Sequence, residues 1–141
     1  MAHSKKLQFI LNKLYELNPD KIELKLDRVL RLANDLGNPH KKLKNVITVT
    51  GTNGKGGTAF YLKEILQAHG YAVSLFQSPF LYNFLTRFLI NGKPLDEEKF
   101  INFVIEVDKA NNNQDITFFE YITCIAFKVF AEAKSDFNIM E

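Results

Sequence analysis

The sequence has few of the residues that mark disulfide-rich, secreted or membrane proteins. Its 141 residues include one cysteine, no tryptophan and four prolines. One cysteine excludes a disulfide framework within the chain, and no apolar run approaches the ~18 residues that a membrane-spanning helix needs. Near the N-terminus, polar residues interrupt the apolar ones at helical spacing and no cleavage site follows, which argues against a secretory signal. We therefore expect a cytoplasmic protein with no membrane partner.

An excess of one charge is missing as well. The formal net charge is +2, and the lysines are scattered rather than clustered. Without a concentrated basic surface, nothing favours a nucleic-acid partner. The length suits one domain, and the 46% hydrophobic and 24% charged fractions are typical of globular proteins. These figures predict a globular protein with one core, and they leave the oligomeric state open.

Residues 1–44 are predicted to form an N-terminal helical segment. Apolar residues recur at helical spacing over residues 7–17, and Ser4 stands where a helix cap is expected. A second apolar stripe covers residues 26–36. Gly37 follows it as the expected left-handed stop.

From residue 45 the apolar pattern changes to that of strands alternating with helices. Residues 45–50 and 71–76 are short apolar runs typical of buried strands, and residues 59–69 keep helical spacing between them. Strand, glycine loop, helix and strand make one βαβ unit, for which parallel pairing and a right-handed crossover are expected.

The remaining sequence continues the alternation. A strand is predicted over residues 87–92, ending at an Asn-Gly turn, with helices over 96–109 and 119–130 and a third core strand over 136–140. Cys124 falls in the second of these helices and is expected in the core. The predicted fold is α/β, a parallel sheet flanked by helices over residues 45–141.

The stretch "VTGTNGKGGT", residues 49–58, carries the clearest chemical signal. A strand that turns into a helix through glycines can aim several backbone N–H groups and the positive helix end at one anion. Lys55 adds a mobile charge for a β- or γ-phosphate. The common G-x-x-x-x-G-K-[ST] pattern is not met, because its first glycine would fall at Val49; the chain has G-x-x-G-K-G-x-T from Gly51 to Thr58. The alternative is a glycine-rich turn without function.

Several motifs together resemble one family. "LGNP" precedes the glycine loop, and "SPF" (78–80), "RFLING" (87–92), "TFFEYIT" (117–123) and "DFNIME" (136–141) follow it. In this order and at these distances, the chain from about residue 24 onward resembles the N-terminal part of the folylpolyglutamate synthase and dihydrofolate synthase family of the Mur ligase superfamily.

The resemblance implies an ATP-dependent ligase of folate metabolism. ATP phosphorylates a carboxylate of dihydropteroate or of a folate, and the amino group of L-glutamate attacks the acyl phosphate to form an amide. ATP is then a co-substrate and Mg²⁺ the expected metal, and the P-loop-type sheet of residues 45–141 is expected to be a partial ATP-binding domain. Whether the first glutamate is added or a polyglutamate tail is extended stays open.

The family's phosphate loop matches this chain position by position. The expected cofactor-binding residues are Gly51, Thr52, Asn53, Gly54, Lys55, Gly56, Gly57 and Thr58, with Lys55 also the expected catalytic residue. In the family a Ser or Thr follows "GKG" and helps to bind magnesium, but Gly57 stands here. Thr58, one residue later, is the candidate replacement. Otherwise Thr58 caps or packs in the first helical turn.

Two further metal ligands are implied by the resemblance. Ser78 matches the serine of the family's "SP" motif, and Glu141 matches the acidic residue that ends the third strand. Hard oxygen ligands are what Mg²⁺ prefers. The alternatives are a simple turn before Pro79 and a frayed terminal carboxylate. Nearby, Arg87 keeps the arginine of the family's "ERI" pattern, whereas Thr86 replaces its glutamate.

Substrate contacts are implied for Phe80, Thr117 and Phe119. In the dihydrofolate synthase branch, Thr117 and Phe119 match residues that contact the pterin ring, and Phe80 is a candidate pocket wall. Thr117 and Glu120 also satisfy the capping-box rule for a helix start without any ligand. An ordinary core position is the alternative for Phe80.

The resembled enzymes are much longer than this chain. We therefore expect a truncated piece in which the C-terminal ligase domain is absent and which does not catalyse the reaction alone. With the third strand last, an incomplete sheet with an exposed apolar edge is expected. Two alternatives stay open: a noncatalytic nucleotide- or folate-binding remnant, and another P-loop enzyme such as a cell-wall Mur ligase.

Overall fold

The computed structural model describes residues 3–17, 25–80 and 82–141, and the chain divides into two units. The first unit combines the chain up to Asn38 with Glu97–Ile125, and the second combines Pro39–Asp96 with Ala126–Glu141. Each unit is thus built from two stretches that lie far apart in the sequence.

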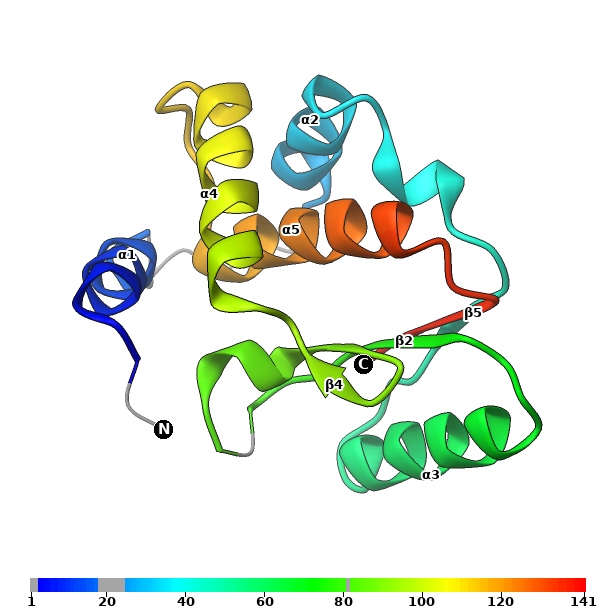
Figure 1. Cartoon of the computed structure of the whole chain (residues 1–141). Helices are drawn as coiled ribbons and strands as arrows, with labels where there is room; N and C mark the ends of the chain where they lie inside the picture. The colour runs from blue at the N-terminus through cyan, green and yellow to red at the C-terminus, as the bar shows by residue number, and fades with distance from the viewer. Residues whose placement is uncertain (1–2, 18–24, 81) are drawn as a thin grey trace. The chain divides into compact units, whose positions relative to one another are not determined.

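Helices make up the described part of the first unit (Figure 1). They are α1 (Lys5–Tyr15), α2 (Asp27–Asp35), α4 (Glu97–Asn111) and the first half of α5 (Phe118–Ala133), up to Ile125. The Ser4 hydroxyl accepts a hydrogen bond from the Leu7 N–H at 3.1 Å, so the predicted cap of α1 is confirmed. Gly37 has a φ of +80°, which confirms the left-handed stop after α2.

The start of α5 is held by a capping box and an ion pair. The Thr117 N–H donates to Glu120 Oε2 at 2.9 Å, and the Glu120 N–H donates to Thr117 Oγ1 at 3.4 Å, as the sequence predicts. The Arg28 guanidinium of α2 also donates to both carboxylate oxygens, at 2.9 and 3.1 Å. Burial by itself raises the pKa of the Glu120 carboxyl, but the hydrogen bonds from Arg28 and Thr117 outweigh it and hold the pKa below its usual value.

Cys124 lies in the core, as predicted. Its side chain is fully buried, and burial raises the pKa of the Cys124 thiol to about 12, so the thiol stays protonated at neutral pH. Because the reactive thiolate form is scarce, we assign Cys124 a packing role rather than a chemical one.

The second unit contains a five-stranded sheet with helices on both faces (Figure 1). Its strands are β1 (Val46–Thr48), β2 (Val73–Phe76), β3 (Phe88–Ile90), β4 (Lys93–Pro94) and β5 (Phe137–Met140), in the order β1-β5-β2-β3-β4. Helix α3 (Lys55–Ala68) connects β1 to β2 and covers one face, where Ala59 packs with Val73, Leu75 and Ile139. On the opposite face, the buried Ser74 hydroxyl lies 2.7 Å from that of Ser135, just after α5.

Strand β5 lies between β1 and β2 and is parallel to both. The predicted βαβ unit is present, but its two strands do not pair directly. Ile139 of β5 is fully buried, as is typical of a parallel strand whose sheet is covered on both faces. The third core strand is therefore interior, whereas β1 is an outer strand of the described sheet and leaves Val46 48% exposed.

The predicted α/β fold is confirmed, with one addition to the parallel sheet. β3 and β4 are antiparallel and form a hairpin on the far side of β2. Asn91 and Gly92 both have positive φ, at 50° and 75°, so the predicted Asn-Gly turn is confirmed. A two-residue turn reverses the chain directly, which makes antiparallel pairing the only outcome. The strand also begins one residue later than predicted, because Phe84–Arg87 form a 3-10 helix.

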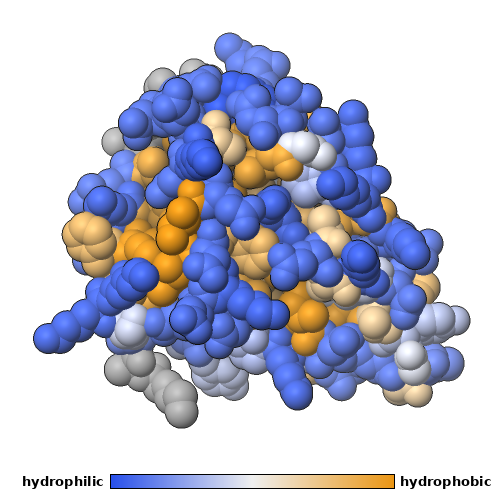
Figure 2. Space-filling model, turned by 45° about the horizontal axis from the view of Figure 1, so that its top comes forward, coloured by the Kyte–Doolittle hydropathy of each residue, from blue (hydrophilic) through white to orange (hydrophobic). Residues whose placement is uncertain are grey.

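Exposed apolar side chains are spread among hydrophilic ones on the face that Figure 2 draws. Among all described residues, not only those on this face, the most exposed large hydrophobic side chains are Tyr82, Tyr61, Leu26, Phe9, Ile105 and Ile65. Within the part of the chain that the structure describes, no helix has the length and apolarity to cross a bilayer.

The Glu120 network predicts a pH-dependent loss of stability. In Glu120→Gln the charge-assisted bonds from Arg28 are weakened, and we expect the free energy of unfolding to fall by about 1–2 kcal/mol at pH 7. The folded pKa is lowered, so this stabilisation is present above the unfolded value of 4.5 and is lost as pH falls through the folded pKa. Urea unfolding at pH 7 and pH 3 measures both effects.

The matched control is Glu132→Gln, an exposed glutamate on the same helix. It should leave the free energy of unfolding unchanged at both pH values. Equal effects of the two substitutions at pH 7 would contradict the role given to Glu120.

Candidate functional site

The glycine loop leaves β1 and leads directly into α3, in the second unit. Gly51 has a φ of +147° and Gly54 a φ of +77°, conformations that side chains with a Cβ rarely adopt. Residues 51–54 are exposed, and a Cβ added at Gly54 would meet nothing within 4 Å. The loop is therefore open to solvent, as an anion site requires.

The first turn of α3 presents its free backbone donors at this loop. Gly54 is the N-cap, and the first intrahelical bond runs from the Thr58 N–H to the Gly54 carbonyl at 3.0 Å. The N–H groups of Lys55, Gly56 and Gly57 precede that bond, so they have no partner within the helix. The positive end of the helix dipole adds to them. A Cβ added at Gly51 would lie 3.9 Å from Lys55 Cγ, which shows that the lysine stem runs back beside the loop.

Glu141 and Ser78 meet this turn from the ends of β5 and β2. The Glu141 N–H donates to the Phe76 carbonyl at 2.9 Å and so extends the β2–β5 pairing. The Ser78 N–H donates to Glu141 Oε2 at 3.4 Å. A Cβ added at Gly56 would lie 3.6 and 3.8 Å from the two Glu141 carboxylate oxygens, so this carboxylate packs against the first turn of α3.

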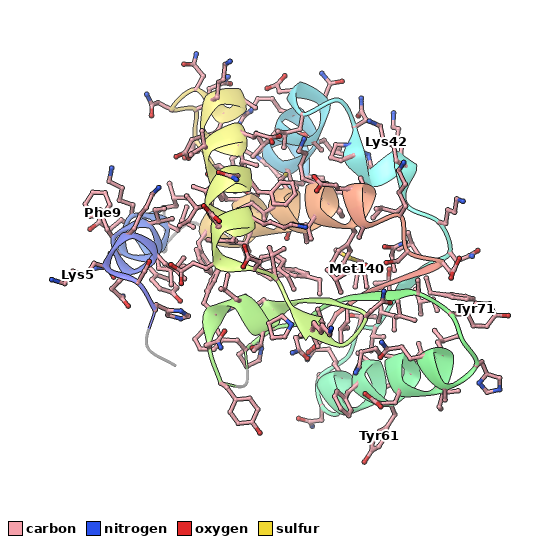
Figure 3. The ribbon with its side chains drawn as sticks, in the orientation of Figure 1. Lys5, Phe9, Lys42, Tyr61, Tyr71 and Met140 are labelled. Atoms are coloured by element: carbon pink, nitrogen blue, oxygen red, sulfur yellow. The ribbon has the colours of Figure 1, made fainter. Side chains whose placement is uncertain are left out.

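These groups line a single cavity of about 420 Å³. Its walls are Gly56, Gly57, Phe60, Tyr61, Gln77, Ser78, Pro79 and Glu141. The sequence predicted four of these positions. Phe60, Tyr61, Gln77 and Pro79 were missed, although Phe60 and Tyr61 follow Gly57 at the three- and four-residue spacing that places side chains on one helix face. Tyr61 projects from α3 away from the sheet (Figure 3).

The donor set suits a magnesium ion that is shared with phosphate groups. Within the described residues, no three His, Cys, Asp or Glu side chains gather to hold a metal. One carboxylate and one hydroxyl beside free N–H groups are instead typical of Mg²⁺ sites, because that ion keeps several waters and binds phosphate oxygens as well. Ser78 and Glu141 would hold the ion from the protein side.

Gly57 is not imposed by packing. A Cβ added there would meet nothing within 4 Å, and its φ is not in the left-handed region. A serine or threonine would therefore fit, and the expected metal-side hydroxyl is missing for no steric reason. Thr58, the next residue, is exposed and does not line the cavity.

Arg87 reaches the site from the 3-10 helix that precedes β3. Its Nη1 donates to Ser78 Oγ at 3.0 Å, and its guanidinium carbon lies 5.3 Å from the Phe80 ring centroid. Phe80, the predicted pocket wall, is 36% exposed beside this arginine. The Thr86 side chain takes no part in the site, because its hydroxyl donates to the Asn83 carbonyl at 2.6 Å.

Thr117 and Phe119, the other predicted substrate residues, belong to the first unit. Thr117 is engaged in the capping box, which leaves its oxygen able to accept a further bond. Phe119 is 49% exposed at the start of α5. An exposed aromatic ring beside a capped helix end can stack on a flat heterocycle.

No family model matches the chain. It is 37% identical to the dihydrofolate synthase/folylpolyglutamate synthase of Escherichia coli (strain K12) over 131 residues, which are 93% of this chain and 31% of that protein. The structure of E. coli FolC in complex with DHPP and ADP shares 37% identity and a TM-score of 0.89, over 96% of this chain and 32% of that one. The chain belongs to the folylpolyglutamate synthase/dihydrofolate synthase family. It corresponds to the N-terminal part of these proteins. It spans about a third of the length of these relatives.

A second structure of this family describes a bifunctional folylpolyglutamate synthase/dihydrofolate synthase with Mn, AMPPNP and L-glutamate bound. The match covers 96% of this chain and 32% of the chain in that structure, with 34% identity and a TM-score of 0.87. The family resemblance expected from "GTNGKG", "SPF" and "DFNIME" is thereby confirmed, and so is the expected N-terminal position within the longer relatives.

Proposed function

We propose that this chain supplies the nucleotide-binding part of an ATP-dependent ligase of folate metabolism. The reaction joins L-glutamate to dihydropteroate, or to a (tetrahydro)folate or its polyglutamate, through an acyl phosphate. Relatives crystallised with ADP, with DHPP and with AMPPNP, Mn and L-glutamate support the proposal. The observation that carries it is the cavity in which the first turn of α3 meets Ser78 and Glu141. A reducing, cytoplasmic setting suits the buried, unpaired Cys124.

The polyphosphate of ATP would lie on the backbone N–H groups of the loop. Residues 51–57 supply these donors together with the helix dipole, and Lys55 adds a charge that follows the transferred phosphate. Fixed donors need no rearrangement as charge develops, which is how such loops lower a barrier. Lys55 is the residue to which we give the catalytic role.

Ser78 and Glu141 would hold the magnesium ion of MgATP. A magnesium ion bound there would supply positive charge that offsets the charge of the phosphates. The Ser78 hydroxyl and the Glu141 carboxylate are joined through the Ser78 N–H, so they act as one preformed pair. Thr58 stays a candidate ligand only if the first turn of α3 shifts or a water bridges it to the ion, because it does not line the cavity.

Two separate proposals concern the substrate: Thr117 and Phe119 of the first unit contact the pterin ring, and Phe80 of the second unit is a pocket wall. Aromatic rings and one hydroxyl suit a flat heterocycle with polar edges. The choice between addition of the first glutamate and extension of the tail depends on contacts of this kind.

A noncatalytic nucleotide-binding remnant is the second candidate, and Gly57 is the observation that favours it. A loop that lacks its metal-side hydroxyl still offers all its N–H groups to a phosphate. Affinity for ATP that does not depend on Mg²⁺ would favour the remnant, and affinity that rises with Mg²⁺ would favour the ligase.

Lys55→Ala tests the phosphate role directly. Loss of a charge-assisted contact should weaken ATP binding on the order of 10- to 100-fold while the fold stays intact. Isothermal titration of the 141-residue chain with ATP and Mg²⁺ measures this, and circular dichroism checks the fold. Lys44→Ala, an exposed lysine before β1, is the control and should bind as the wild type does. An unchanged affinity in Lys55→Ala would remove that lysine from the site.

Phe119→Ala tests the folate assignment. Losing an aromatic contact with the pterin should weaken dihydropteroate binding about fivefold and leave ATP binding unchanged. Phe9→Ala is the matched control, since Phe9 is an exposed phenylalanine of the same unit. Saturable dihydropteroate binding that is equal in both variants would contradict the role of Phe119. A complete lack of dihydropteroate binding in the folded wild type would count against the folate substrate.

A further inference from the structure

Arg87 is nearly buried, at 7% exposure, yet its charge is not used by the phosphate loop or by the substrate contacts described above. Its position follows from the antiparallel pairing of β2 with β3. Phe76 faces Phe88 in the register, and the pairing continues by one residue, because the Gln77 N–H donates to the Arg87 carbonyl at 3.0 Å. The next residue along from Gln77 is Ser78, so the arginine side chain is set beside the serine.

Two aromatic rings hold the guanidinium in place. Its central carbon lies 5.3 Å from the Phe80 centroid and 5.6 Å from the Phe84 centroid, within the range of cation–π contact. Phe84 is fully buried, and its ring centroid lies 6.1 Å from that of Phe88 in the core. The Gln77 side chain also donates to the Thr86 carbonyl at 2.8 Å, which ties the 3-10 helix to the end of β2. The guanidinium therefore stands on a rigid support.

The chemistry of the contact gives it a direction. Arginine has donors only, so Ser78 Oγ must accept the bond at 3.0 Å. A hydroxyl oxygen has two lone pairs, and this bond occupies one of them. The second lone pair stays available to a cation, while the Ser78 N–H is already fixed on Glu141.

We propose that Arg87 is the positioning residue of the cation site, holding the Ser78 hydroxyl beside Glu141. This inference rests on the proposed function, in which Ser78 and Glu141 hold the magnesium of MgATP. Gly57 makes the role more important, because without a hydroxyl at that position Ser78 carries the one aliphatic hydroxyl among the cavity-lining residues of the described site, beside the phenol of Tyr61. A mobile Ser78 would then leave the carboxylate as the main protein ligand.

The test separates Mg²⁺-dependent from Mg²⁺-independent binding of ATP. The affinity of the 141-residue chain for ATP is measured by titration with Mg²⁺ and again with EDTA. Arg87→Met should weaken binding with Mg²⁺ by about tenfold, as loss of a ligand-orienting partner does, and leave binding with EDTA unchanged. In a Ser78→Ala background, Arg87→Met should have no further effect, because Arg87 acts through that hydroxyl.

Two further variants guard against a general disturbance. Thr86→Val removes the hydrogen bond to Asn83 in the same 3-10 helix without touching Ser78, and should bind MgATP as the wild type does. Arg87→Lys keeps the charge but loses the planar fork, so it should fall between wild type and Arg87→Met. If Arg87→Met does not fold, Arg87→Lys replaces it in the same titrations with Mg²⁺ and with EDTA.

Each contrary outcome has its own meaning. Equal weakening with and without Mg²⁺, an undiminished effect in the Ser78→Ala background, or tighter Mg²⁺ binding once the charge is removed would overturn the positioning role and leave the proposed function standing. A wild-type chain that is folded but binds no ATP under either condition would overturn the proposed function and this inference together.

Discussion

The candidate site depends on the place of β5 between β1 and β2. Parallel strands end at the same edge of a sheet, so the residue after a middle strand can meet the loops that follow both of its neighbours. Glu141 does this: it contacts Ser78 after β2 and packs against Gly56 after β1. An outer β5 would bring it to one loop only. The fully buried Ile139, which β1 and β2 flank, holds the strand in that middle position.

The elements with strong local signals could be predicted from the sequence. Helical spacing, the cap at Ser4, the stop at Gly37 and the Asn91-Gly92 turn all act over a few residues, and the structure confirms each of them. Strand order could not be predicted in the same way. β1 and β5 are about ninety residues apart in the chain, and three short apolar strands carry the same pattern whatever their order.

The candidate site shows the same division between local and non-local information. The glycine loop could be found because its chemistry lies within eight consecutive residues. The contact between Arg87 and Ser78 depends instead on the register of an antiparallel pair, and the cavity wall at Gln77 depends on where β2 ends. The roles of individual site residues, and the division of function between residues 1–44 and 45–141, stay predictions. The structure groups the N-terminal helices with Glu97–Ile125.

Two departures from the family pattern have local consequences only. Thr86 turns its hydroxyl to the Asn83 carbonyl, and Gly57 leaves an open space on the first turn of α3. Gly56, Gly57, Ser78 and Glu141 still line one cavity, and Lys55 begins the helix beside it. In the proposed magnesium site, one hydroxyl fewer is available.

The most direct measurement is a map of amide chemical shifts of the ¹⁵N-labelled chain during titration with AMPPNP and Mg²⁺. If a polyphosphate lies on the turn from Gly51 to Gly57, those amides should shift most, and Ser78 and Glu141 should shift only when Mg²⁺ is present. Saturable binding with these amides unmoved and the largest shifts on other elements would contradict the account.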